Sequence, residues 1–380
     1  MTPFLARPIR RRTLAVGGAL AVLLPGRRAL AVLPSILDAL GRTVSLKGAA
    51  ERIVLDFNYE EFTAVAGPAG WDRVVGFNKA QWATNRAAIY RRYLVPIPRL
   101  AALADVGSTE TGSFSMERVL SLRPDLVVLG YWSFVALPDQ VKQLEALGIP
   151  VMVVDYNAEM PERHVASTLA LGVATGNEER ARALAALYTD KLAEIRRRVA
   201  DAPVRPKVYV ELGQGGADVV GNTYWKGMWG RLVEFAGADN IAAGRLPGAG
   251  AWGPLAPEYV LAANPDAVFI AGSSWTGRPD AVLTGFDADE ATTRARLLPY
   301  ARRQGWPEMA AVRNGQLHAI EHGLCRALFD YTATQYIAKA IFPDRCADLD
   351  PVAELRRYHE QFLPVAFEGT WMARLAPPPA

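Results

Sequence analysis

Two short segments of the chain are apolar at every position, and each follows the same local pattern. Residues 126–130 have the sequence LVVLG, and residues 267–271 have the sequence AVFIA. Runs of this length without polar alternation are typical of strands buried on both faces of a parallel sheet. The longer stretches that contain them, 115–130 and 256–271, match without a gap at a separation of 141 residues. The chain therefore repeats one structural unit.

Each copy of the repeat predicts a short helix that leads into its strand. Glu117 matches Glu258 near the helix start, where a negative charge complements the helix dipole. Pro257 suits the first helical position of the second copy. A Pro-Asp pair closes the unit at 124–125 and again at 265–266. The residue before a proline avoids helical geometry, so each helix should end there.

Further apolar runs predict more strands on either side of each copy. They lie at 52–57 and 149–156 around the first copy, and at 207–212 and 316–321 around the second. Helical patterns lie between them. We expect two related α/β lobes, with helices on the faces of mostly parallel sheets.

The segment between the halves has the pattern of one long helix. Residues 178–200 would extend over roughly 34 Å. One apolar stripe runs along them among charged residues, at Leu184, Tyr188, Leu192, Ile195 and Val199. An ordinary surface helix would have the same stripe. Its position between the halves favours a rigid connector.

The N-terminus has the layout of an export signal. Arginines occupy positions 10–12, an apolar run of 11 residues follows from Leu14 to Leu24, and Ala29–Ala31 offers small residues for cleavage. Paired arginines favour the twin-arginine route. A membrane anchor is the alternative, but the run is shorter than the roughly 20 residues that span a bilayer. We expect cleavage after Ala31 and a periplasmic protein.

Removing this signal changes the sign of the net charge. The whole chain has 42 basic and 39 acidic residues, a formal net charge of +3, and residues 1–31 hold six arginines and no acid. The mature chain is therefore close to −3, which gives no support for nucleic-acid binding. We predict an export signal at 1–31, an N-terminal lobe at 32–176, a connecting helix at 177–201 and a C-terminal lobe at 202–380.

The only two cysteines, Cys325 and Cys346, are expected to remain unpaired. Export would permit a disulfide. The segment between them predicts a helix from about Leu328 to just before Pro343, which would hold the two residues farther apart than a disulfide allows.

With these features the sequence resembles a known family, the substrate-binding proteins of ABC importers for ferric siderophores, haem and cobalamin. It is similar to the ferrichrome- and cobalamin-binding proteins of the class with a helical backbone. The resemblance covers nearly the whole mature chain. It depends most on the pattern E-x-V-L-x-x-x-P-D-x-V at Glu117 and Glu258, on residues 221–242 and on residues 311–323. The resemblance implies two α/β lobes joined by one long helix, with the ligand between them.

The resemblance also implies a role for the repeated glutamates. In this family one such glutamate on each lobe docks onto arginines of the two membrane permease subunits. Glu117 and Glu258 occupy these positions. Carboxylate–arginine pairs of this kind steer and orient a complex. A simpler alternative is that both acids only stabilise their helix N-termini.

Ligands of open α/β sheets bind beyond the carboxyl ends of the strands. Aromatic and arginine residues gather in segments that follow the expected strands, and glycine-rich flanks favour loops over core for the tryptophans. Tryptophan suits a broad chelate or macrocycle, and arginine neutralises anionic chelates. Packing or surface roles are the alternative for each residue alone. The candidate ligand contacts are Trp82, Tyr90, Arg91, Arg92, Tyr131, Trp132, Tyr224, Trp225, Trp252, Trp275, His322 and Arg326.

Direct metal ligation by the protein is not expected. His318 lies within a strand, while His164 and His359 are expected on helix surfaces, which leaves His322 as the one near a cleft. No C-x-x-C or H-E-x-x-H motif is present. No P-loop and no G-x-S-x-G motif is present either, and 213–218 is more simply a turn than a nucleotide loop.

The sequence therefore predicts a monomeric periplasmic binding protein, not an enzyme. It would capture an iron chelate, a ferric siderophore, and deliver it to an ABC importer without a cofactor of its own. Haem, cobalamin or molybdate are alternative ligands in the same fold. An exported two-lobed α/β enzyme is the alternative from another class.

Overall fold

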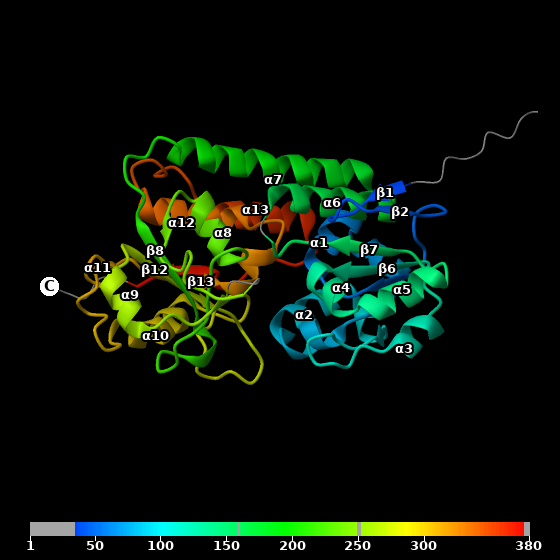
Figure 1. Ribbon diagram of the computed structural model, residues 1–380, viewed down its shortest axis with the longest axis horizontal. Coiled ribbons are helices and arrows are strands. Elements are labelled where there is room, and N and C mark those ends of the chain that lie inside the picture. The colour runs from blue at the N-terminus through cyan, green and yellow to red at the C-terminus, as the bar shows by residue number, and fades with distance from the viewer. Residues whose placement is uncertain (1–34, 159, 249–251, 376–380) are drawn as a thin grey trace, which may run out of the picture. The chain divides into compact units, whose positions relative to one another are not determined.

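The computed structural model describes residues 35–158, 160–248 and 252–375. The predicted export signal and its cleavage point lie outside these ranges. The described residues form one compact unit, which contains two sheet-based lobes (Figure 1). The predicted α/β fold with two parallel-sheet lobes is confirmed.

The first lobe is built on a five-stranded parallel sheet with the order β5-β4-β3-β6-β7. Its strands are β3 (Ile53–Leu55), β4 (Val74–Phe77), β5 (Ala104–Asp105), β6 (Leu126–Gly130) and β7 (Val151–Val154). Every residue of β3, β6 and β7 is buried, as their continuously apolar sequences predict. The lobe also contains the hairpin β1 (Ser35–Leu37) and β2 (Thr43–Ser45), and helices α1 (Tyr59–Ala66), α2 (Ala87–Leu94), α3 (Met116–Ser121), α4 (Tyr131–Ala136) and α5 (Pro138–Ala146).

The second lobe repeats this plan with one antiparallel edge. Its main sheet has the order β10-β8-β12-β13-β14, and only β14 runs antiparallel to its neighbour. The strands are β8 (Lys207–Leu212), β10 (Asp239–Asn240), β12 (Ala267–Gly272), β13 (Leu317–Glu321) and β14 (Met372–Arg374), and β9 (Thr223–Tyr224) pairs separately with β11 (Trp252–Gly253). The helices are α8 (Trp229–Phe235), α9 (Pro257–Ala263), α10 (Glu290–Ala301), α11 (Ala310–Arg313), α12 (Tyr331–Ile341) and α13 (Pro351–Phe362).

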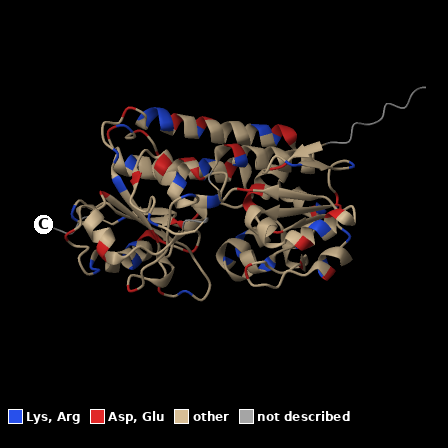
Figure 2. Cartoon of the chain, viewed as in Figure 1, with Lys and Arg blue, Asp and Glu red and all other residues tan. Residues whose placement is uncertain are grey.

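Helix α7 (Glu178–Val199) follows α6 (Pro161–Thr175) and comes between the two sheets in sequence. It packs against α6 and α12 (Figure 1). Its first turn is acidic and its last turn holds three arginines, so its charges oppose the helix dipole at both ends (Figure 2). Four of the five predicted stripe residues are buried, and Val199 is half-buried. The predicted long helix is confirmed.

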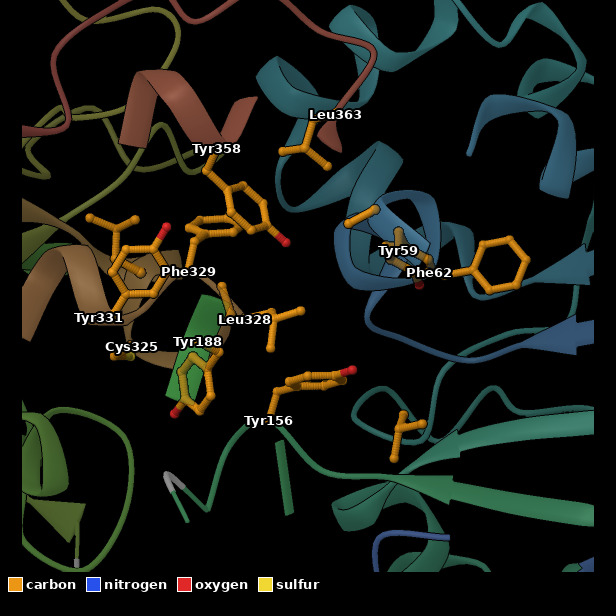
Figure 3. Close-up of a cluster of buried hydrophobic side chains, with 14 of the residues drawn as sticks. Tyr59, Phe62, Tyr156, Tyr188, Cys325, Leu328, Phe329, Tyr331, Tyr358 and Leu363 are labelled. Atoms are coloured by element: carbon orange, nitrogen blue, oxygen red, sulfur yellow. The ribbon is translucent and has the colours of Figure 1, made fainter. Parts of the chain in front are cut away.

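One buried hydrophobic cluster extends from the first lobe through α7 into the second. Figure 3 shows Tyr59 and Phe62 of α1 together with Phe329 and Tyr358, which come from the C-terminal part of the chain. Separating the lobes at this level would expose apolar surface, at roughly 25 cal/mol for each Å². Any opening of the lobes is therefore expected to pivot about this cluster.

Three local predictions have clear outcomes. Cys325 and Cys346 are free and buried, as expected. His164 on α6 and His359 on α13 are fully buried, so their predicted surface positions are wrong. The stretch after β6, predicted as a loop, is instead helix α4.

Candidate functional site

The carboxyl ends of strands from both lobes meet at a small internal cavity. Strand β3 ends just before Phe57 and α1, and β13 ends at Glu321 and leads into a short 3₁₀ turn, His322–Arg326. The cavity has a volume of about 20 Å³. Its lining residues are Phe57, Asn58, Tyr59, Glu60, Glu61, Gln81, Trp82, Arg86, Gly323, Arg326 and Ala327. A space of this size holds about one water molecule, so the lobes are closed in this structure.

Arg86 joins the two lobes at the centre of this site. Its guanidinium lies 3.1 Å from Glu321 Oε1 in the second lobe and 3.7 Å from Glu60 Oε2 in the first. Ser273 Oγ also donates to Glu321 Oε1, at 2.9 Å. A Cβ atom at Gly323 would lie 2.4 Å from Arg86 Nη2 and 2.7 Å from Glu321 Oε2. Only glycine leaves room there for the ion pair.

A second buried carboxyl, Glu61, lies next to this pair. The backbone N–H of Leu328 donates to Glu61 Oε1 at 3.3 Å, and Asn58 Nδ2 donates to Oε2 at 3.3 Å. Burial, and then the charge of the neighbouring Glu60, raise the pKa of Glu61 to about 7. Burial also raises the pKa of Glu60, against the lowering effect of Arg86. The charges of Arg86 and Arg326 therefore do not fully offset the effect of burial on the carboxyl groups of Glu60 and Glu61.

Trp82 lies inside an aromatic cluster, in a single π-helical turn, Ala80–Thr84. Its ring stacks on Tyr59 at 4.8 Å and on Trp71 at 5.7 Å between centroids. It is only 2% exposed, so the interpretation of this tryptophan as a loop residue outside the core is wrong. Its Nε1 nevertheless has no hydrogen-bond partner among the described residues, and the side chain lines the cavity.

His322 is buried beside the cavity and is held in its neutral form. Trp229 Nε1 donates to His322 Nδ1 at 3.1 Å, so the ring hydrogen belongs on Nε2. Burial, and then the charges of Arg326 and Arg86, hold the pKa of His322 well below its usual value. The rings of Tyr224 and Trp275 lie 6.1 Å and 5.7 Å from the imidazole.

Arg326 lines the cavity beside Phe57, and Trp132 contacts Phe57 from behind the cavity wall. The guanidinium of Arg326 lies 5.5 Å from the Phe57 ring centroid, and Trp132 meets the same ring edge-on at 4.4 Å. Six of the candidate contacts therefore gather at or beside the cavity: Trp82, Trp132, Tyr224, Trp275, His322 and Arg326.

Arg91 and Arg92 pair with acids of the second lobe instead of lining the cavity. Arg91 Nη2 lies 2.6 Å from Asp287 Oδ2, and Arg92 Nη1 lies 2.8 Å from Asp287 Oδ1. Arg92 also approaches Glu368, at 3.4 Å, and its guanidinium covers the ring of Phe286 at 5.1 Å. These contacts bridge the lobes at the surface.

The remaining candidates have other surroundings. Tyr90 donates to the carbonyl of Leu100 at 3.2 Å, inside its own lobe. Tyr131 is exposed and lies under the guanidinium of Arg163, at 5.1 Å. The ring of Trp225 is covered by the Nζ atom of Lys226, at 4.9 Å, and Trp252 is 59% exposed at the β9–β11 pair. None of these four side chains lines the cavity described above.

Sequence reasoning missed the charged centre of the site. Glu60 and Glu61 follow the first expected strand, Arg86 lies within the aromatic segment already singled out, and Glu321 ends the last expected strand. Their position after strands was a usable signal. Nothing local showed that Arg86 would reach a residue 235 positions away.

Comparison with known proteins identifies the family. A family model described as "Periplasmic binding protein" matches residues 58–322. The chain is a member of this family. This binding protein is 33% identical to the TroA-like periplasmic binding protein FepB from Veillonella parvula, over 90% of its own length and 99% of that chain, with a TM-score of 0.84.

One curated relative and one solved structure are more distant. The binding protein is 23% identical to YvrC of Bacillus subtilis, an uncharacterized ABC transporter substrate-binding lipoprotein, over 82% of its own length and 86% of the relative. The molybdate-binding protein MolA of Haemophilus influenzae shares its fold, with 18% identity, a TM-score of 0.65 and coverage of 88% and 99%. The chain is thus the extracytoplasmic substrate-binding component of an ABC importer, and not an enzyme.

Glu117 and Glu258 lie away from the cavity, in the first turns of α3 and α9. Both are exposed. Glu258 also lines a surface recess of about 740 Å³, together with Asp218, Leu261 and Arg302.

Among residues 35–158, 160–248 and 252–375, no three His, Cys, Asp or Glu side chains are grouped so as to hold a metal ion. Within the same ranges, none of the helices combines the length and the apolarity needed to cross a bilayer.

Proposed function

We propose that this binding protein captures an iron chelate, a ferric siderophore, between its lobes and delivers it to the permease of an ABC importer. The observation that supports this most is the interlobe cavity, to which both lobes contribute aromatic and charged side chains. Buried polar atoms without partners there, such as Trp82 Nε1 and Glu60 Oε1, need a ligand or water to satisfy them. The proposed contacts are Glu60, Trp82, Arg86, Trp132, Tyr224, Trp275, His322 and Arg326.

Capture of a chelate requires the lobes to separate. A cavity of about 20 Å³ is far smaller than the several hundred Å³ that small-molecule sites usually offer. Opening would break the pairs of Arg91 and Arg92 with Asp287, which are partly exposed and therefore weak. We propose that these arginines act as a clasp between the lobes, and not as ligand contacts.

Tryptophan fluorescence tests the ligand. Ferric siderophores, haem, cobalamin and molybdate would be added in turn to the purified protein. A ferric siderophore should quench with micromolar or tighter affinity, about −8 kcal/mol or better. Binding of molybdate alone would overturn the chelate proposal, and turnover of any added compound would contradict the binding role.

A pair of variants locates the quenched tryptophans. Trp275→Phe removes a ring close to His322, whereas Trp306→Phe removes a buried ring in the other core cluster of the second lobe. A smaller quenching amplitude is expected only in the first variant, because Trp82 and Trp132 would still report the ligand. Equal quenching in both would exclude the site beside His322.

We further propose that Glu117 and Glu258 dock onto the permease. Both are exposed, each starts the helix of one repeat, and neither lines the cavity. Exposed carboxylates orient a complex more than they strengthen it, so ligand binding should not depend on them.

The export proposal concerns residues outside the described ranges. We propose the twin-arginine route and cleavage after Ala31. Replacing Arg11 and Arg12 by lysine should leave precursor in the cytoplasm, because the arginine pair is the address. Normal periplasmic accumulation of the double variant would contradict this route, and N-terminal sequencing of the mature protein would test the cleavage point.

A further inference from the structure

The interlobe cavity has more buried acids than bases. The carboxyl groups of Glu60, Glu61 and Glu321 gather around it or directly behind its wall, against the guanidinium groups of Arg86 and Arg326. Glu61 and Glu321 are 4% and 1% exposed. Even where Glu61 holds a proton, Arg86 and Arg326 do not outnumber the two remaining carboxylates. An anion that entered this poorly hydrated space would therefore meet no excess of positive charge to stabilise it.

The hydrogen-bonding atoms left without partners show the same imbalance. Three acceptors that line the cavity or lie directly behind its wall have no hydrogen-bond partner among the described residues: Asn58 Oδ1, Glu60 Oε1 and Glu321 Oε2. Two donors are in the same state, Trp82 Nε1 and Arg326 Nε. A buried acceptor is satisfied only by an N–H or O–H group. A ligand that fits must therefore bring donors, which a bare oxyanion lacks.

In this closed structure, most positive charges near the site are paired with carboxylates of the protein. Arg86 lies between Glu60 and Glu321, and the close approach of Gly323 fixes it there. Arg91 and Arg92, the residues that the sequence assigned to an anionic chelate, face Asp287 across the lobes. Arg326 is the guanidinium that remains next to the cavity without an ion pair in the described structure.

We infer that the site selects an uncharged or cationic metal chelate that presents N–H or O–H donors, and that it discriminates against anionic ligands. This inference rests on the proposed function of chelate capture and narrows its ligand. Ferric trihydroxamates and corrinoids share this chemistry. Ferric tricatecholates, haem with its propionates, and molybdate do not.

The first experiment is a ligand panel on the unaltered protein. Affinity is measured by fluorescence and by calorimetry for ferrioxamine B, which carries a free ammonium group, for its N-acetylated form, for cyanocobalamin, for a ferric tricatecholate, for haem and for molybdate. The tightest ligand should be one of the first three, at least about 100-fold tighter than any anion, a difference readily resolved in Kd.

Two results of the panel would overturn the inference in distinguishable ways. If an anionic chelate binds tightest, chelate capture stands and the charge selection is wrong. If no metal chelate binds, the proposed function fails and the inference fails with it.

A variant pair tests the charge directly. Glu60→Gln keeps the shape of the side chain and removes its charge, while Glu51→Gln makes the same change at an exposed position of the same lobe. Glu60→Gln should weaken ferrioxamine B about tenfold relative to its acetylated form, and Glu51→Gln should leave the ratio unchanged. An unchanged ratio in both variants would show that Glu60 does not sense the ligand's charge. The panel on the unaltered protein stands even if Glu60→Gln folds poorly.

Discussion

The two copies of the repeat fold alike, but the two lobes complete them differently. In both, a short helix with an exposed glutamate in its first turn leads into a fully buried interior strand of the sheet. The first helix has a side-chain cap, because the N–H of Arg118 donates to Ser115 Oγ at 3.3 Å. The second begins at Pro257 without such a cap. The two copies therefore share the acidic first turn and the buried strand, whereas the residue that caps the start of the helix differs.

The Pro-Asp pair shows why this part of the pattern is shared. Asp125 accepts backbone N–H groups of Glu51 and Arg52, at 2.8 and 2.9 Å, just before β3. Asp266 accepts the N–H of Lys207 at 2.7 Å, at the start of β8. In each lobe this aspartate fastens the beginning of the central strand to its neighbour, which a charge-assisted hydrogen bond does well.

The largest effect is expected when both exposed glutamates are replaced, and it should reduce transport without a comparable loss of ligand affinity. Glu117→Ala with Glu258→Ala should sharply reduce uptake of labelled ligand by cells, because steering and orientation on the permease are lost. Affinity of the purified variant should stay within about a factor of ten, or 1.4 kcal/mol. Charge reversal to arginine should be worse than alanine.

The single variants sharpen the comparison of the lobes. Glu258 lines a recess, so Glu258→Ala is expected to reduce uptake more than Glu117→Ala. Glu51→Ala is the matched exposed control and should transport normally. Uptake at the wild-type level in the double variant would show that both glutamates only stabilise their helix N-termini. Loss of ligand binding together with transport would show that they are needed for the fold or for the ligand site.

The next effect concerns pH, because the lobes bury different titratable groups. The pKa of Glu61 in the first lobe is raised from 4.5 to about 7, so the folded protein retains a proton that the unfolded chain loses. The free energy of unfolding should therefore fall between pH 4.5 and 7, by at most roughly 3 kcal/mol. Glu61→Gln should flatten this part of the curve in urea unfolding, and an equally steep fall in the variant would argue against the assignment.

His318 in the second lobe should act with the opposite sign. It is 3% exposed, its Nδ1 lies 2.9 Å from Tyr336 Oη, and burial lowers its pKa to about 3. Below pH 6.5 the unfolded chain binds a proton at this histidine, whereas the folded protein keeps it neutral. The free energy of unfolding should therefore decline as pH falls from 6.5 toward 3. His164 and His359, whose pKa values burial lowers to about 3 and about 4, add to the same decline. Thermal unfolding between pH 4 and 8 would check both signs.

A smaller effect is expected at the repeated aspartates. Asp125→Ala should lower the free energy of unfolding by about 2 kcal/mol and Asp266→Ala by about 1 kcal/mol, because the first accepts two backbone N–H groups and the second accepts one. Urea unfolding of the two variants would measure the difference. Asparagine at either position keeps an acceptor and should recover part of the loss, and the reverse order would contradict this account of the repeat.

The smallest effect distinguishes the two helix ends. Arg123 and Asn264, each just before the proline, have φ values of 47° and 46°. Asparagine tolerates this left-handed conformation, but arginine is strained in it. Arg123→Gly should therefore stabilise the protein by about 1 kcal/mol. Asn264→Gly should stabilise the protein less, because it also removes the hydrogen bond from Ala310 N–H to Asn264 Oδ1. Urea unfolding would measure both changes, and an equal gain in the free energy of unfolding would contradict this difference between the two helix ends.

Local sequence patterns determined much of this protein. The repeat, the buried strands and the long helix α7 follow from the period of apolar residues, which secondary structure imposes directly on the chain. The helix between Cys325 and Cys346 likewise correctly predicted two free thiols. The position of Glu117 and Glu258 in the first turns of two matching helices also followed from the local pattern.

The tertiary structure alone decided which charges meet. Nothing near Arg86 in the sequence indicates that it pairs with Glu321, and nothing near Arg91 or Arg92 indicates Asp287, because these contacts form only when the two lobes close. The burial of Trp82, His164 and His359 likewise depends on what packs against their helices, which the pattern of one helix cannot reveal. Periodicity is a property of neighbours in sequence, whereas the charge balance of the cavity is set by side chains that only the fold brings together.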